Sequence, residues 1–188
     1  MSEEQLNEVK FSDEAIQFIN KLAAACVEKG DREPELGFRD TKSVYVFLNN
    51  KGVPGYVWFT RKDNINTGIP FKEFKGHIKG LVLVGAVRKN KDVPKLRLLM
   101  TGEDKEAHTF EIGYGTNTAK CVISALAVLT PKQVKLPVTI QPYQSKEEES
   151  VVFVSVTCEG ERVDTRYDAA SDWEAKLAQA QANINPEQ

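Results

Sequence analysis

The sequence predicts a mainly β protein, and three observations lead to that prediction. From Phe71 onward, most apolar residues alternate with polar ones, which is the period of a strand that buries one face. The stretch Phe74–Val87 has the pattern of one long strand whose glycines, Gly76, Gly80 and Gly85, permit strong bending. Few segments have the period of a helix. The 188 residues are enough to bury a core and are most simply one domain with extensions.

The first predicted element is a helix from Asp13 to Lys29. Ser12 is suited to cap its N-terminus, and Gly30 is suited to the left-handed residue that ends such a helix. The apolar residues of this segment share one face, so the helix is expected to pack against another part of the chain.

A β-hairpin is predicted next. Ser43–Leu48 and Tyr56–Thr60 are rich in strand-forming residues and are separated by the turn-like sequence NNKGVPG. Alternation places Tyr45 and Phe47 on one face of the first strand. The polar segment 61–70, RKDNINTGIP, is predicted to be a loop.

The remaining elements are strands and two helices. A helix is predicted from Asn117 to Leu129, and because it is apolar on nearly all sides, it should be buried. Ser171 begins a capping box, SDWE, for a C-terminal helix with an apolar stripe formed by Trp173, Leu177 and Ile184. Further strands are predicted at Lys95–Met100, His108–Tyr114, Leu136–Tyr143, Val151–Cys158 and Arg162–Arg166.

From Phe74 to Cys158 the predicted order is three strands, one helix and two strands, with a long glycine-rich first strand. This order resembles the OB-fold, a small Greek-key β-barrel whose helix lies between the third and fourth strands. The resemblance implies an OB-like barrel at 71–168. It also implies an N-terminal extension of helix and hairpin at 1–70, packed on the barrel, and a C-terminal amphipathic helix at 169–188.

The middle of the chain is strongly basic, although the protein carries a net charge of −2. Residues 51–100 contain eleven basic and three acidic residues, whereas the segments 1–50, 101–150 and 151–188 are each net negative. A basic stretch within a nearly neutral protein is suited to a surface that binds a polyanion. The eleven residues are Lys51, Arg61, Lys62, Lys72, Lys75, Lys79, Arg88, Lys89, Lys91, Lys95 and Arg97.

Alternation directs part of this basic segment to a common face of the expected barrel. Lys75, His77 and Lys79 share one side of the first strand, and Lys95 and Arg97 share one side of the second. OB-fold proteins bind single strands on this face, with basic side chains near phosphates and aromatic rings stacked on bases. The resemblance therefore implies a single-stranded nucleic-acid-binding protein. DNA is favoured over RNA, and the expected role is in replication, recombination or repair, like that of accessory proteins of bacteria or their phages.

Aromatic residues near the basic segment are candidates for base stacking. Tyr45, Tyr56 and Trp58 belong to the predicted hairpin, where each ring would either stack on a base or pack the hairpin onto the barrel. Two acidic features oppose nucleic-acid binding: Glu111, which should point outward from the third strand, and the loop Glu147–Glu149. The predicted binding site comprises Tyr56, Trp58, Arg61, Lys62, Phe71, Lys72, Phe74, Lys75, His77, Lys79, Arg88, Lys89, Lys91, Lys95 and Arg97.

The sequence contains no recognisable motif for catalysis, and we expect a protein without enzymatic activity, metal or cofactor. Only two histidines, His77 and His108, are present, and neither a GxSxG nor an HExxH motif occurs. The glycine-rich segment 113–120, GYGTNTAK, opens a predicted helix, but it lacks the spacing of a P-loop. It is expected to be a tight turn between a strand and a helix.

Two further classes of function stay open beside nucleic-acid binding: a protein-interaction module, and a small enzyme whose site has no recognised motif. The basic face would also suit an adaptor or inhibitor that binds an acidic protein, and the C-terminal stripe would suit a protein partner or a second copy of this chain. Three widely spaced cysteines, Cys26, Cys121 and Cys158, are typical of reduced thiols in a cytoplasmic protein. No apolar run approaches the ~20 residues of a membrane span.

Overall fold

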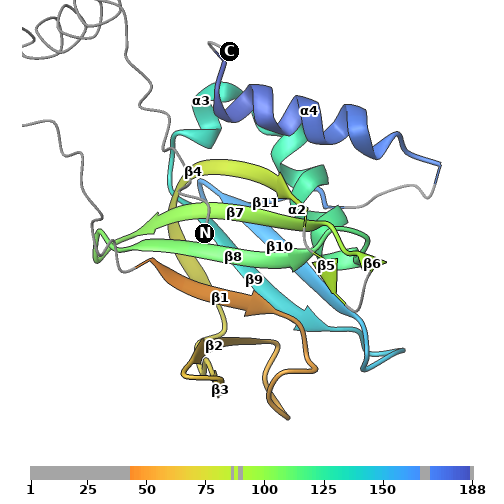
Figure 1. The fold of residues 1–188 in the computed structure, drawn as a ribbon. Helices are drawn as coiled ribbons and strands as arrows, with labels where there is room; N and C mark the ends of the chain where they lie inside the picture. Colours follow the sequence, from red (N-terminus) through yellow and green to blue (C-terminus); the bar gives the residue numbers. More distant parts are fainter. Residues whose placement is uncertain (1–42, 86, 89–90, 166–169, 187–188) are drawn as a thin grey trace, which may run out of the picture. The chain divides into compact units, whose positions relative to one another are not determined.

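The computed structural model describes residues 43–85, 87–88, 91–165 and 170–186 (Figure 1). The chain divides into two compact units, Met1–Asp40 and Thr41–Gln188, and the description below concerns the second. The predicted helix at 13–29 lies outside the described residues. No helix in the described part of the chain is long and apolar enough to cross a membrane.

Within the described residues, nine strands form one mixed sheet in the order β11-β10-β9-β4-β7-β8-β1-β2-β3. A separate two-stranded ribbon, β5 (Val87–Arg88) and β6 (Lys91–Asp92), lies in the connection between β4 and β7. The strands of the large sheet are β1 Val44–Leu48, β2 Trp58–Lys62, β3 Ile65–Gly68, β4 Phe74–Val84, β7 Lys95–Gly102, β8 Ala107–Gly113, β9 Val138–Gln144, β10 Val152–Cys158 and β11 Glu161–Val163.

The sheet is open, so the predicted closed barrel is wrong. Closing a sheet into a barrel requires its two outermost strands to pair with each other. Here β1 pairs in parallel with the free edge of β8, while β11 covers the free edge of β10. The sheet therefore ends at β3 and β11 instead of closing. With the helices included, the architecture is mixed α/β and not a mainly β barrel.

The predicted hairpin is confirmed, because β1 and β2 pair antiparallel with Phe47 opposite Phe59. The predicted loop at 61–70 is wrong, since β2 continues to Lys62 and pairs with β3. Asp63 and Asn64 connect these two strands with φ angles of 50° and 62°. Two consecutive positive φ angles are the geometry of a type I′ turn, which Asp and Asn tolerate and which joins antiparallel strands closely.

The strand β4 bends the sheet around the core. Its first residues, Phe74–Gly76, pair with β9, the stretch Gly76–Val84 pairs with β7, and the register with β7 shifts between Ile78 and Gly80. In Figure 1, β9 and β10 consequently pass behind β7 and β8. The apolar core lies between these layers and comprises, among others, Leu96, Leu98, Phe110, Ile112, Val138, Ile140, Val154 and Val156.

Three helices are found in the described part of the chain: α2 (Asn117–Val128), α3 (Pro131–Val134) and α4 (Trp173–Ile184). The buried helix predicted at 117–129 is confirmed as α2, with Thr116 as its N-cap. Pro131, which follows shortly after α2, begins α3. The N-cap of α4 is Asp172, one residue after the predicted Ser171.

Helix α4 packs its apolar stripe within the chain itself. Leu177 is buried, and Trp173 and Ile184 are partly buried against the same core. The side-chain amide of Asn183 donates to the carbonyls of Leu126 and Ala127 in α2, at 3.0 and 3.1 Å. Helix α4 therefore packs this stripe against α2 and β4.

Candidate nucleic-acid interface

The outward-pointing side chains of β7, β8, β1 and β2 form a surface that we call the outer face. Strand pairing aligns Arg97 of β7 with Glu111 of β8, and Glu111 with Phe47 of β1. One row along, Thr109 of β8 lies opposite Tyr45 of β1. Paired residues in a sheet point to the same side, so these side chains share one face.

Arg97 lies between a carboxylate and an aromatic ring on the outer face. Its Nε and Nη2 atoms donate to the same Glu111 oxygen, at 3.1 and 3.0 Å. Its guanidinium carbon lies 5.6 Å from the centre of the Tyr45 ring, and Tyr45 is 42% exposed. Glu111 thus fixes the position of Arg97 and offsets the charge of the guanidinium. The predicted outward orientation of Glu111 suggested this effect.

A second arginine and ring lie beside the first pair. The guanidinium carbon of Arg61 is 5.5 Å from the centre of the Phe47 ring. Phe47 stacks on buried Phe59 with 5.3 Å between ring centres, and Arg61 Nε donates to Asn66 Oδ1 at 2.7 Å. The outer face therefore carries two arginine–aromatic pairs, each held by a second contact within the sheet.

The basic residues at the start of β4 point outward as alternation predicted, but they lie apart from Arg97. His77 pairs with Thr101, which is six residues along β7 from Lys95, or about 20 Å at the rise of a strand. His77 Nδ1 lies 3.1 Å from the Lys135 carbonyl. Lys75 forms an exposed ion pair of 3.9 Å with Glu103, and Lys79 is exposed where the register shifts. The five predicted face residues are thus spread along β4 and β7, with Lys75 and His77 near the end of β7, Lys79 at the bulge beside Leu99, and Lys95 and Arg97 near the start of β7.

Two of the predicted stacking rings belong to the core. Trp58 is 2% exposed, and its indole Nε1 donates to the carbonyl of Phe71 at 2.7 Å. Phe74 packs against the rings of His108 and Phe110, with centres 4.6 and 4.9 Å away. A base has no access to the face of a buried ring, so the assignment of Trp58 to stacking is wrong, whereas Phe74 is partly buried against the core and is engaged by its two neighbouring rings.

The other predicted rings line a separate groove of about 300 Å³ between the β2–β3 hairpin and β9. Tyr56 and Phe71 are exposed there, Phe71 by 73%, and Lys72 lies beside them. The sequence prediction missed Tyr143, an exposed ring of β9 in the same groove. The alternation of buried and outward residues along β9 is a signal that could have found it.

The remaining predicted basic residues lie in turns and connections. Lys62 is exposed at the end of β2. Arg88 and Lys91 pair in the β5–β6 ribbon, which follows β4 where Val84 lies opposite Lys95. The structure describes only the backbone of Arg88 and Lys91, and Lys89 lies outside the described residues.

The groups suited to other chemistry lie apart from the outer face. Burial raises the pKa of the Cys121 and Cys158 thiols, which leaves little reactive thiolate at neutral pH. In the turn between β7 and β8, possible metal-ligating atoms of Asp104, Glu106 and His108 lie within 4.8 Å of one another. The two carboxylates are exposed, and Asp104 already accepts the backbone N–H of Glu106.

Comparison with protein-family models, curated proteins and solved structures finds no match for this chain. The geometry of the outer face is therefore the principal evidence on function.

Proposed function

We propose that this protein binds single-stranded nucleic acid, with DNA favoured over RNA, on the outer face, and that it acts without catalysis in replication, recombination or repair. The observation that carries the proposal is the pairing of two surface rings with arginines, the exposed Tyr45 with Arg97 and the partly buried Phe47 with Arg61. Rings stack on bases of any sequence, at about 1–3 kcal/mol per base, while guanidinium groups attract the phosphates between them.

The order of the elements supports the same face. The strand order β10-β9-β4-β7-β8, with α2 between β8 and β9, resembles the order of an OB-fold that lacks its closing contact, with β1 paired to β8 instead. Proteins with that fold bind oligonucleotides on the surface of their second and third strands, here β7 and β8. In those proteins, the loop between the first and second strands also contacts the oligonucleotide. The corresponding loop here is the basic connection between β4 and β7, which contains β5 and β6. The parallel addition of β1 supplies the rings that β7 and β8 lack.

The decisive experiment is a titration of fluorescein-labelled oligo-dT, of about 6, 12 and 24 nucleotides, at low salt. We expect affinity to rise with length, to fall steeply with added salt, and to exceed that for duplex DNA of the same length. Since Trp58 is buried, fluorescence of the labelled strand is a better signal than quenching of tryptophan. Absence of binding below about 100 μM would contradict the proposal. If poly-glutamate binds as tightly as oligo-dT, and the affinity for oligo-dT does not depend on its length, an adaptor or inhibitor of an acidic protein would be favoured.

Replacing Glu111 with glutamine is expected to tighten the binding of oligo-dT roughly fivefold, or about 1 kcal/mol. Glutamine keeps a hydrogen-bond acceptor for Arg97 but removes the negative charge that offsets the guanidinium. The exchange Glu161→Gln on the edge strand β11 removes the same charge far from the outer face and should leave the affinity unchanged. An equal gain in both variants would show that net charge, and not this face, determines binding.

A further inference from the structure

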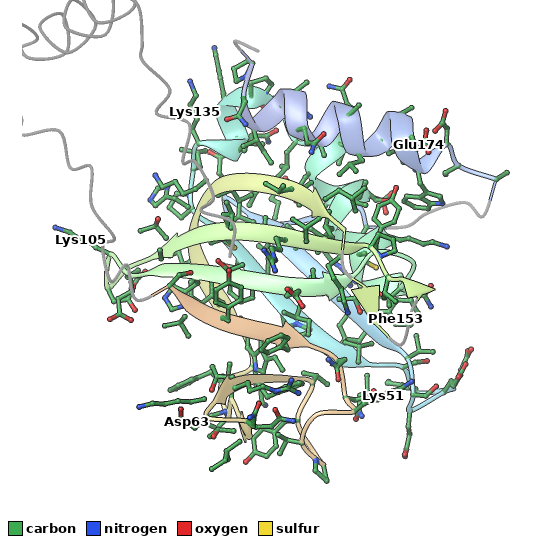
Figure 2. The ribbon with its side chains drawn as sticks, in the orientation of Figure 1. Lys51, Asp63, Lys105, Lys135, Phe153 and Glu174 are labelled. Carbon is green, nitrogen blue, oxygen red and sulfur yellow. The ribbon has the colours of Figure 1, made fainter. Side chains whose placement is uncertain are left out.

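A cavity of about 470 Å³ opens at one end of the outer face, where β1 and β8 end and β7 begins. It shares Phe47, Lys95 and Glu111 with that face. The first residues of α2 and the end of the β9–β10 loop form its opposite walls. Figure 2 shows Lys51 in the segment that follows β1, on the side of that loop. The volume is that of a site for a small molecule such as a nucleotide.

The described residues that line this cavity carry a net positive charge, from Lys51 and Lys95 against Glu111. Lys51 and Lys95 both line it, and no ion pair of either ammonium group is found within the residues that the structure describes. Among the described residues, Glu111 is the single carboxylate of the lining, and its charge is offset by Arg97. Two cations facing a concave, partly enclosed space create a local potential that attracts anions.

The other polar groups of the walls are engaged in contacts that shape the cavity. Asn49 accepts the backbone N–H of Lys51 at 3.0 Å, and the amide of Asn50 donates to the Glu149 carbonyl across the two loops. Thr118 donates to the Val152 carbonyl at 2.6 Å, which joins α2 to β10. The two lysines are thus flexible cationic donors on a framework of fixed walls.

We propose that this cavity binds a phosphate monoester, namely the terminal phosphate of the strand that lies on the outer face. A monoester carries a charge of about −1.5 to −2 at pH 7, which two ammonium groups match better than the single charge of an internal phosphodiester. The acidic residues Glu147–Glu149 directly precede Ser150 of the lining and would repel a strand that continued past the cavity. The cavity therefore suits the end of a strand. That the phosphate belongs to a nucleic-acid strand rests on the proposed function.

The test compares oligo-dT that bears a 5′-phosphate, a 3′-phosphate or two hydroxyl ends. In the wild type, one terminal phosphate is expected to tighten binding about fivefold or more. In Lys51→Gln this gain should disappear while the affinity for hydroxyl-ended strands changes less than about twofold. Lys132→Gln, an exposed exchange on α3, should retain the gain. Equal affinity for all three strands in the wild type, or a gain that persists in Lys51→Gln, would overturn the inference.

A second measurement separates this inference from the proposed function. Binding of dTMP and of thymidine is measured by equilibrium dialysis against the wild type and Lys51→Gln. If the wild type binds dTMP but not thymidine, and Lys51→Gln loses the binding of dTMP, the phosphate site is supported. This holds even if no oligonucleotide binds and the proposed function fails. No binding of dTMP, together with no effect of a terminal phosphate, overturns the site even if oligo-dT binds with two hydroxyl ends.

Discussion

Replacing Phe110 with alanine is expected to lower the free energy of unfolding by about 3–5 kcal/mol, the largest stability effect that we expect from a single exchange. Phe110 is 1% exposed on β8, and its ring centre lies 4.9 Å from that of Phe74 and 6.5 Å from that of Trp58. It thereby connects β8 with β4 and with the β1–β2 hairpin. Urea denaturation followed by far-UV circular dichroism measures the loss.

Two variants provide the comparison. Phe110→Leu keeps most of the volume and should cost less than about 1.5 kcal/mol. Phe71→Ala removes a ring that is largely exposed and should change stability by less than about 0.5 kcal/mol. In a Trp173→Phe background, Trp58 emission should follow the same transition as circular dichroism, because the hairpin belongs to the sheet. A separate, earlier transition of Trp58 would contradict this placement of β1 and β2.

The sequence was sufficient to predict elements whose signal is local. In Lys75–Lys79 of β4 and Lys95–Leu98 of β7, outward basic residues alternate with buried apolar residues or glycines, so the directions of these side chains were predictable. The apolar surface of α2 on nearly all sides likewise predicted its burial. These patterns depend on neighbours within a few positions of the chain.

The openness of the sheet has no such local signal. It follows from the parallel pairing of β1 with β8, which joins residues more than 60 positions apart, as in the hydrogen bond between the Ser43 and Thr109 hydroxyls. Alternation specifies which side chains share a face but not which strand becomes the neighbour. The edge strand β3 was missed for a related reason, since INTG contains one large apolar residue and that residue is exposed.

In the candidate site, the outward placement of the charged residues was easier to predict than that of the aromatic residues. Basic side chains stay near solvent wherever their strand lies, so Lys95 and Arg97 were placed correctly on an outward face. A ring is equally compatible with the core and with the surface, so the sequence left both roles open for Tyr45 and Trp58, and the structure exposes Tyr45 and buries Trp58. Only the long-range pairing of β1 brings Tyr45 to Arg97.

Replacing Tyr45 with alanine is expected to weaken the binding of oligo-dT about 10- to 100-fold, because the exchange removes the ring on which one base stacks. Because Tyr45 is exposed and pairs through its backbone, the fold should be preserved. The slope of affinity against salt should stay constant, since no charge changes. In Arg97→Gln, by contrast, the slope should fall by about one.

The groove between the β2–β3 hairpin and β9 provides the matched control for Tyr45, because it contains exposed tyrosines that lie away from the outer face. Tyr56→Ala and Tyr143→Ala should each change the affinity for oligo-dT less than about threefold if the strand lies on the outer face. A large loss in these two variants, with none in Tyr45→Ala, would place the strand in the groove between the β2–β3 hairpin and β9. It would also contradict the proposed path along β7, β8 and β1. Tyr45→Phe keeps the ring and should bind like the wild type, which separates stacking from any contact of the hydroxyl.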